Sequence, residues 1–156
     1  MTTIVWDGKT LAGDRCSWSG PTRRQVRKVF RITAKDGKDF LVGFCGDGAF
    51  ALAVLAWMRG DADKPMARLF GVSPDAQCAL VIDSDLTVWG VGGSLAYYRF
   101  DEKMMAMGGG QEFAWGALEA GATAAQAVEI AAKRSDYAAM GVDTVSFDKP
   151  AEDVTP

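Results

Sequence analysis

Histidine is absent from this sequence of 156 residues, and its absence narrows the chemistry that the chain can perform. Serine–histidine and cysteine–histidine nucleophile pairs, histidine proton shuttles and histidine-ligated metal sites are all excluded. Thr2 offers another route, because removal of Met1 would leave a threonine with a hydroxyl nucleophile and an α-amine base. An α-amine has a reference pKa of about 8, so it can accept the hydroxyl proton near neutral pH. Taken alone, Thr2 is more simply explained as a good strand former.

A threonine nucleophile of this kind needs a nearby cation, and that cation must itself be held in place. Lys28 is the candidate cation, because it interrupts the mainly apolar face of an expected strand. Asp14 is the candidate anchor, because it follows a hairpin from the strand that begins at Thr2. Each residue alone is more typical of a solvated strand lysine and a turn aspartate. The combination predicts a site made of all three.

The elements that must position these residues are mainly strands. Asp7-Gly8 and Asp36-Gly37 are turn signals that predict two hairpins. The segment Arg15–Arg24 contains Ser, Gly and Pro, and it predicts a loop. The expected strands are Thr2–Trp6, Thr10–Gly13, Val26–Thr33, Phe40–Cys45, Cys78–Ile82, Leu86–Val91, Ala96–Phe100, Met104–Met107 and Asp143–Phe147.

Helices are expected in two separate stretches. The first comprises Ala49–Met58 and a short helix at Met66–Phe70, and the second comprises Gln111–Glu119 and Ala124–Tyr137. Thr123 and Gln126 predict a capping box for the last helix. Segregated runs of strands and helices favour an α+β fold. The length favours a single domain over residues 1–156, with a flexible polar tail at 148–156.

In their order and spacing, several motifs resemble those of proteasome β subunits and of the bacterial HslV-type peptidase. The resemblance covers roughly Thr2–Phe147, is weakest between Gly60 and Gln77, and suggests a short bacterial or phage homologue. The motifs are Thr2-Thr3-Ile4-Val5, Ala12-Gly13-Asp14, Arg27-Lys28-Val29, Gly43-Phe44-Cys45-Gly46, the run Gly108–Gly116 and the segment Asp136–Phe147.

This resemblance implies a four-layer αββα sandwich, the fold of the N-terminal nucleophile hydrolases. It implies a threonine peptidase in a self-compartmentalising homo-oligomeric ring, acting on peptides or unfolded proteins, with an ATP-dependent unfoldase as a further partner. The implied catalytic residues are Thr2, Asp14 and Lys28, with the Gly46 N–H as oxyanion donor and Asp136 supporting the nucleophile. The implied substrate-binding residues are Phe44, Gly48 and Gly109, of which Phe44 and Gly48 would make an apolar pocket.

Two positions depart from the family pattern. The family usually has serines where Gly109 and Ala139 stand, and these hydroxyls orient the amine and water. Their loss leaves open a weak or inactive proteasome-like assembly, and an amidohydrolase that does not act on peptides is a further alternative. The retained Thr2, Asp14 and Lys28 favour the peptidase over the inactive assembly, and the motif-by-motif match favours it over the amidohydrolase.

Composition excludes several partners. The net charge of −3 shows no basic excess for nucleic acid, and the longest apolar stretch, around Ala49–Met58, is too short to span a membrane. The three cysteines, Cys16, Cys45 and Cys78, lack a CxxC pair, which argues against zinc. No cofactor or metal is expected, and the odd cysteine number without a signal peptide predicts the cytoplasm.

One charged cluster falls outside these motifs. Five arginines occur within a short segment, and the ordinary explanations are a solvated face or a contact between ring subunits. They are Arg15, Arg23, Arg24, Arg27 and Arg31.

Overall fold

The structure, a computed structural model, describes residues 2–136 and 139–149. Its strands are β1 (Thr3–Trp6), β2 (Leu11–Asp14), β3 (Cys16–Ser19), β4 (Thr22–Gln25), β5 (Val29–Thr33), β6 (Asp39–Phe44), β7 (Gln77–Asp83), β8 (Val88–Gly92), β9 (Tyr97–Phe100), β10 (Met105–Gly108) and β11 (Val142–Val145). Its helices are α1 (Gly48–Arg59), the 3₁₀ turn η1 (Ala67–Phe70), α2 (Gln111–Glu119) and α3 (Ala124–Arg134).

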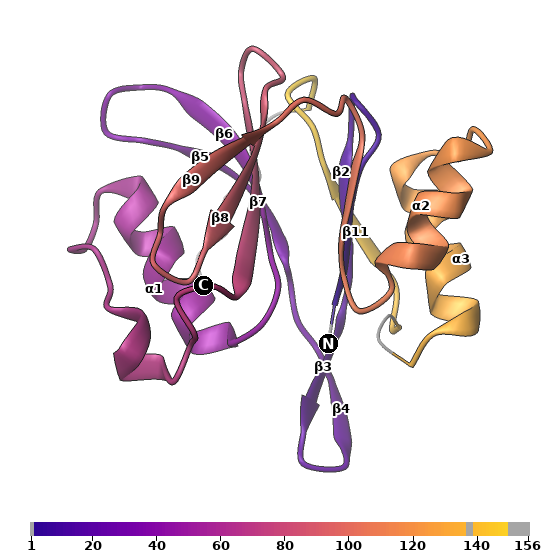
Figure 1. Cartoon of the computed structure of the whole chain (residues 1–156), viewed down its shortest axis with the longest axis horizontal. Coiled ribbons are helices and arrows are strands. Elements are labelled where there is room, and N and C mark those ends of the chain that lie inside the picture. The colour runs from indigo at the N-terminus through magenta and orange to yellow at the C-terminus, as the bar shows by residue number, and fades with distance from the viewer. Residues whose placement is uncertain (1, 137–138, 150–156) are drawn as a thin grey trace.

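A four-stranded antiparallel sheet has the order β10-β1-β2-β11. Strand β1 therefore lies inside the sheet, between its hairpin partner β2 and the much later strand β10. Helices α2 and α3 cover the outer face of this sheet, where small side chains such as Ala12, Ala106 and Ala127 let them pack closely (Figure 1). The expected capping box of α3 is present, because Thr123 Oγ1 accepts from Gln126 N and Thr123 N donates to Gln126 Oε1.

A five-stranded antiparallel sheet has the sequential order β5-β6-β7-β8-β9. Alternate side chains of its strands, such as Val42 and Val81, face α1 and form an apolar core with Phe50, Val54 and Leu55 of that helix. Helix α1 begins at an Asp47 N-cap and ends at Gly60, which takes a left-handed conformation with φ +81°.

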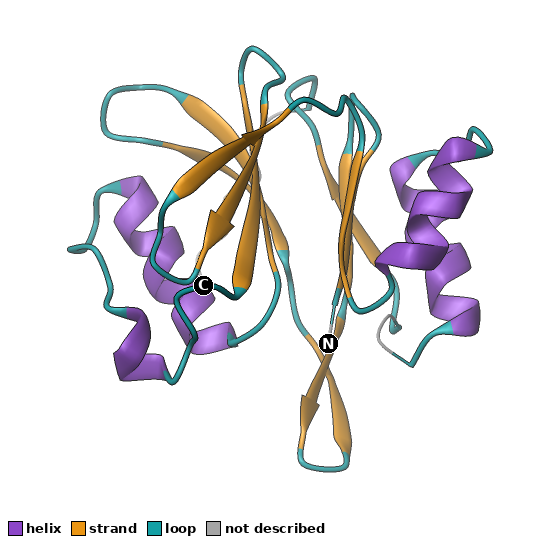
Figure 2. Ribbon diagram, in the orientation of Figure 1, coloured by secondary structure: helices purple, strands orange, loops and turns teal. Residues whose placement is uncertain are grey.

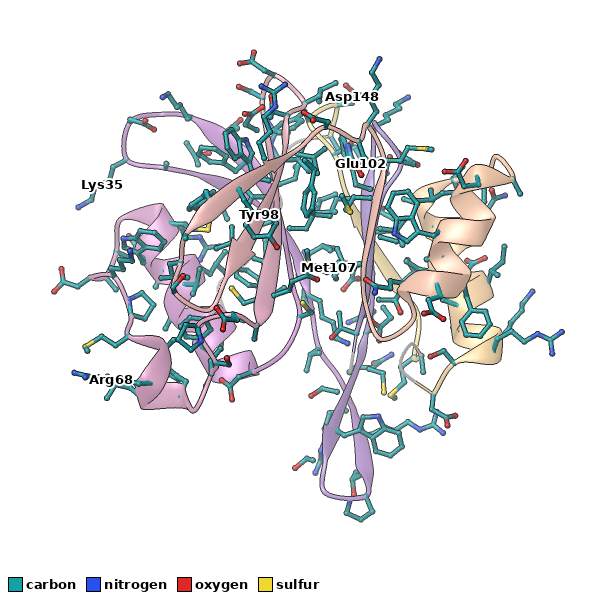
Figure 3. The ribbon with its side chains drawn as sticks, viewed as in Figure 1. Lys35, Arg68, Tyr98, Glu102, Met107 and Asp148 are labelled. Atoms are coloured by element: carbon teal, nitrogen blue, oxygen red, sulfur yellow. The ribbon has the colours of Figure 1, made fainter. Side chains whose placement is uncertain are left out.

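The two larger sheets pack against each other through a second core, in which Met107 is one of the labelled side chains (Figure 3). Two glycines bring the sheets close at one end. A Cβ at Gly43 would lie 2.5 Å from Ile4 Cγ2, and one at Gly13 would lie 2.9 Å from Ile4 Cδ1 and Val29 Cγ1. The missing side chains thus make room for Ile4 between the strands that carry the candidate site residues.

The expected loop at Arg15–Arg24 is wrong, because this segment forms a β-hairpin. Strands β3 and β4 pair from Cys16 with Gln25 to Ser19 with Thr22, and they make a third, two-stranded sheet. This hairpin projects away from the body of the molecule (Figure 1). The sequence did not indicate this hairpin, because its polar residues and Gly20-Pro21 turn are typical of a loop. Its strands pair through the backbone without burying an apolar face, so they show no apolar alternation.

The expected four-layer αββα sandwich is also wrong for this chain, which consists mainly of antiparallel strands in three sheets with few helices (Figure 2). The helical elements beside the five-stranded sheet are α1 and the four-residue η1. Between α1 and β7 the described chain is otherwise turns and irregular backbone, since the segment 61–76 has two prolines and no long apolar period.

Several boundaries differ from the expected ones by a few residues. Strand β8 begins at Val88 instead of Leu86, because Leu86 has a φ of +64° and its N–H closes a turn onto Asp83 O. Helix α3 ends at Arg134, and the expected end at Tyr137 lies outside the described residues, as does most of the polar tail.

Candidate functional site

The candidate catalytic residues come from neighbouring ends of the two larger sheets. Thr2 directly precedes β1, and Asp14 is the last residue of β2, its hairpin partner. Lys28 directly precedes β5, where its carbonyl accepts a 2.9 Å hydrogen bond from Phe44 N at the end of β6. Gly46 follows two residues later. The hairpin registers therefore carry three separate chain segments to one place.

The Asp14 carboxylate is the most connected group of the site. It is fully buried, and both oxygens lie within 3.1 Å of Lys28 Nζ. Oδ1 also accepts a 2.8 Å hydrogen bond from Thr3 N, while Oδ2 accepts from Cys16 N at 3.0 Å and from Ala139 N at 3.4 Å. A buried carboxylate needs this kind of compensation, because an unpaired charge in the interior is very costly. Asp14 thus fixes Lys28 and the backbone next to Thr2 at once.

Thr2 is buried against the backbone of Gly108. It is 5% exposed, and a Cβ at Gly108 would lie 2.1 Å from the Thr2 carbonyl oxygen. Gly108 also has a φ of +99°, so glycine is required there for both space and conformation. The neighbouring Thr3 hydroxyl is buried without a hydrogen-bond partner in the described chain, and it lies against Gly110.

Gly46 occupies an exposed turn between β6 and α1. Its φ is +90°, and a Cβ there would meet no atom within 4 Å, so the conformation explains the glycine better than crowding does. The next residue, Asp47, caps α1 by accepting a 2.6 Å hydrogen bond from Phe50 N. The turn is therefore fixed by the helix that follows, which leaves the backbone beside Lys28 in a defined conformation.

Cys45 lies between Phe44, the last residue of β6, and Gly46. It is half-buried, and its N–H donates to Cys78 O at 3.0 Å. Burial raises the pKa of its thiol to about 11, although the Lys28 charge acts in the opposite direction. The thiol is therefore neutral near pH 7, and it is a poor nucleophile there.

The remaining residues predicted for the site differ in how far they are buried. Phe44 is 4% exposed, and its ring packs edge-on against Phe30 in the core under α1. Gly48 and Gly109 are exposed, at the starts of α1 and just before α2. Asp136 is exposed and makes no hydrogen bond or ion pair with the described residues.

Sequence reasoning missed four contributors to the site, namely the Thr3, Cys16 and Ala139 backbone N–H groups and Gly110. The first three are hydrogen-bond donors to Asp14, and Gly110 leaves room for the Thr3 hydroxyl. The Thr3 N–H could have been predicted from the β1–β2 hairpin, because pairing Ile4 with Gly13 places Thr3 opposite Asp14. The Ala139 N–H could not, since side-chain patterns do not report on backbone donors.

The described residues contain neither a metal-binding cluster nor a membrane-spanning helix. Among residues 2–136 and 139–149, no group of three or more acidic or cysteine side chains is arranged to hold a metal ion. In the same ranges, no helix has the length and apolar character needed to cross a membrane.

Comparison with solved structures finds the same fold in proteins of low sequence identity. Thiobacillus denitrificans BPH has a TM-score of 0.62 at 22% identity, covering 92% of this chain and 95% of that one, and it has also been solved in complex with epoxomicin. The Pseudomonas aeruginosa structure described as a helical assembly of the Anbu complex has a TM-score of 0.69 at 14% identity, covering 94% and 81%. Anbu (ancestral beta-subunit) from Yersinia bercovieri has a TM-score of 0.68 at 10% identity, with the same coverage.

These neighbours correct the resemblance drawn from the sequence. They are Anbu proteins, which form a distinct proteasome-like family, and a BPH, not proteasome β subunits or HslV. No family model matches the chain, and no curated protein matches it. The chain therefore has a fold shared with the Anbu proteins and with Thiobacillus denitrificans BPH, and at these identities the likeness concerns the fold alone.

Proposed function

We propose that this chain is a threonine peptidase that works within a homo-oligomeric assembly, with Thr2 as the N-terminal nucleophile once Met1 is removed. The observation that carries the proposal is the buried Asp14–Lys28 pair beside the residue that would become the amino terminus. A fold has little structural reason to bury such a pair, because replacing it with apolar residues is often neutral or stabilising. Its position next to Thr2 gives it a chemical use.

The chemistry follows from the positions of these groups. The Thr2 hydroxyl oxygen attacks a peptide carbonyl, and the α-amine of the same residue accepts the hydroxyl proton, directly or through a water. The Lys28 ammonium favours the ionised hydroxyl, and Asp14 holds that ammonium in place. The Gly46 N–H stabilises the oxyanion of the tetrahedral intermediate. The C–N bond then breaks, the amine product leaves with a proton, and water hydrolyses the acyl–threonine ester.

Two neighbours support parts of this proposal. Thiobacillus denitrificans BPH has been solved in complex with epoxomicin, so a protein of this fold binds that compound. The helical Anbu assembly of Pseudomonas aeruginosa supports self-association as a property of the fold. An ATP-dependent unfoldase, a cytoplasmic location and the apolar pocket at Phe44 and Gly48 stay predictions.

The decisive experiment compares wild type with Thr2→Ala and Thr2→Ser on a panel of fluorogenic peptides. Thr2→Ala should lose at least about a thousandfold in kcat/KM, because no other group in the site replaces the hydroxyl, while Thr2→Ser should retain part of the activity. Intact mass spectrometry first establishes whether Met1 is absent. An epoxyketone should then add to Thr2 of the wild type, since its ring-closed product needs both the amine and the hydroxyl.

The same experiment separates the alternative of a weak or inactive assembly, which the loss of hydroxyls at Gly109 and Ala139 favours. A Gly109→Ser variant restores one hydroxyl at an exposed position and should raise or preserve the rate. Hydrolysis that persists in Thr2→Ala would contradict the proposal. A wild-type chain that lacks Met1 and neither cleaves peptides nor reacts with the epoxyketone would favour the inactive assembly.

A further inference from the structure

Charge is distributed very unevenly along this chain. The segment 15–31 holds six of the 17 basic residues and none of the 20 acidic ones, which leaves 11 basic residues against 20 acidic residues elsewhere. Three of the six pair with aspartates of the body, namely Arg15 with Asp143, Lys28 with Asp14 and Arg31 with Asp39. Arg23 and Arg24 lie instead on strand β4, in the projecting hairpin.

We call this hairpin, residues 16–25, the arm. Six of the eight residues in its two strands are exposed, and Trp18 is 41% exposed with the Arg23 guanidinium 5.3 Å from its ring centroid. A two-stranded hairpin without a covered face is only marginally stable in water. An exposed tryptophan with arginines is also the composition of protein contact sites. The arm therefore has the character of a segment that is completed by a partner.

A cavity of about 320 Å³ lies on the α1-facing side of the five-stranded sheet. We call it the aromatic cavity. Phe40, Trp89 and Tyr97 line it, together with the carboxylates of Asp83 and Asp85 and with one cation, Lys38. Asp83 is occupied by its own turn, since it accepts hydrogen bonds from Trp89 Nε1 and from the N–H groups of Asp85 and Thr87. The Asp85 carboxylate is exposed and forms no such bond with the described residues.

This lining matches the chemistry of an arginine side chain. A guanidinium stacks on aromatic rings and pairs with carboxylates at the same time. The arm and the β7–β8 turn that carries Asp85 lie at opposite ends of the molecule, so an arm cannot reach the cavity of its own chain (Figure 1). Arg23 and Arg24 point to opposite faces of β4, because successive side chains of a strand alternate, and Arg23 is already stacked on Trp18. We propose that Arg24 of the arm docks into the aromatic cavity of a second copy of this chain.

A contact between two different surfaces repeats from copy to copy. It produces a closed ring if the rotation between copies closes and an open helix if it does not. The inference rests on the assembly part of the proposed function, and it is independent of catalysis. It names the two surfaces through which copies associate, and charge complementarity between a basic arm and an acidic body selects a second copy as the occupant.

The test uses the full chain and measures mass by sedimentation velocity at micromolar concentration. The arm variant is Arg24→Glu, and the cavity variant is Asp85→Ala with Tyr97→Ala. Both should lose assembly, with self-association weakened at least about a hundredfold, because the first places like charges in contact and the second removes the carboxylate and ring that hold the guanidinium. Matched controls change exposed charges on α3, with Lys133→Glu for the arm and Glu129→Ala for the cavity, and should assemble as the wild type does.

Mixing the two variants gives the sharper result. An arm variant still has an intact cavity, and a cavity variant still has an intact arm, so an equimolar mixture should form a 1:1 dimer and nothing larger. That dimer also demonstrates that both variants are folded, and far-ultraviolet circular dichroism checks each one alone.

Three outcomes overturn the inference. They are a wild-type chain that is monomeric at micromolar concentration, variants that assemble like the controls, and folded variants whose mixture stays monomeric or rebuilds the full-size assembly. Because this experiment measures mass and not activity, its result is separate from that of the peptidase test. If the protein is inactive but assembles through the arm and cavity, only the proposed peptidase activity is refuted. If the protein is active but its assembly is unaffected by these substitutions, only the arm–cavity contact is refuted.

Discussion

Two ion pairs involve the chain around β5, one at Lys28 just before the strand and one at Arg31 in its middle, and they differ in almost every physical respect. In the first pair, Lys28 and Asp14 have side chains 9% and 0% exposed, and the carboxylate accepts three further backbone hydrogen bonds. In the second pair, Arg31 and Asp39 are 19% and 31% exposed, and the carboxylate is also hydrogen-bonded to the Thr33 hydroxyl at 2.5 Å. The first pair is fixed by backbone donors from three chain segments, while the second lies within one hairpin, with Arg31 also donating to the carbonyls of Phe147 and Lys149.

The contrast separates a buried ion pair, whose desolvation cost points to a functional role, from an ion pair near the surface, whose cost is small. A buried pair must recover a large desolvation cost through geometry, so losing one partner leaves a charge stranded in the interior. A pair near the surface exchanges water for a neighbour at little net gain. Burial, more than distance, therefore distinguishes the candidate catalytic pair from an ordinary hairpin brace.

The largest expected effect comes from removing the two cations in turn. Lys28→Met should lower the free energy of unfolding by about 3–5 kcal/mol, because Asp14 would remain buried without its counter-charge. Arg31→Met should cost only about 1 kcal/mol. Urea denaturation at pH 7 measures both, and equal costs for the two variants would remove the distinction. Peptidase activity should be lost in Lys28→Met and kept in Arg31→Met.

A smaller effect is expected from acid. The hydrogen bond from Arg31 lowers the pKa of Asp39 below its usual value, with Thr33 helping, although partial burial acts in the opposite direction. Because the folded-state pKa is depressed, its stabilising contribution is present above about pH 4 and is lost as the pH falls through the folded-state pKa. Urea denaturation of wild type and Asp39→Asn should show a gap of at most about 1 kcal/mol at pH 7 that closes in acid. A gap that widened below pH 4 would reverse the sign of this argument.

The smallest expected effect concerns Cys45, which neighbours the buried pair. With its pKa raised to about 11 by burial, the thiol should react with iodoacetamide at pH 8 about a hundredfold more slowly than in the urea-unfolded chain. Its contribution to stability should be full below about pH 9 and decline as the pH rises toward 11. Peptide mapping by mass spectrometry measures the rate at this residue. Equal rates in folded and unfolded chains would show that the charge of Lys28 outweighs burial.

Much of the secondary structure was predictable, because strong turn signals and alternation fix short hairpins. Asp7-Gly8 and Asp36-Gly37 close their hairpins as expected, and α2 has the predicted bounds. The arm was not predictable, since its strands bury almost nothing and so carry no alternating pattern. The helices expected at Ala49–Met58 and Met66–Phe70 are present as α1 and as the 3₁₀ turn η1, with bounds that differ by no more than one residue.

For the candidate site, the sequence identified residue types but not their support. Asp14 and Lys28 are brought together as the hairpins predict. The backbone donor from Thr3 follows from the register of the β1–β2 hairpin, whereas the donor from Ala139 depends on tertiary packing, which residue patterns do not encode. Asp136 was named from the resemblance alone, and its exposed position leaves that role a prediction.

The interior position of β1 also has a consequence for the timing of biosynthesis. The strand that starts beside Thr2 is flanked by β2 and by β10, so its second neighbour leaves the ribosome only after about a hundred further residues. At ~5–20 residues per second, that interval lasts on the order of 5–20 s. In the finished fold Thr2 is 5% exposed and its carbonyl lies against Gly108. Under the proposed function, an aminopeptidase would therefore remove Met1 most readily from the nascent chain, before β10 pairs with β1.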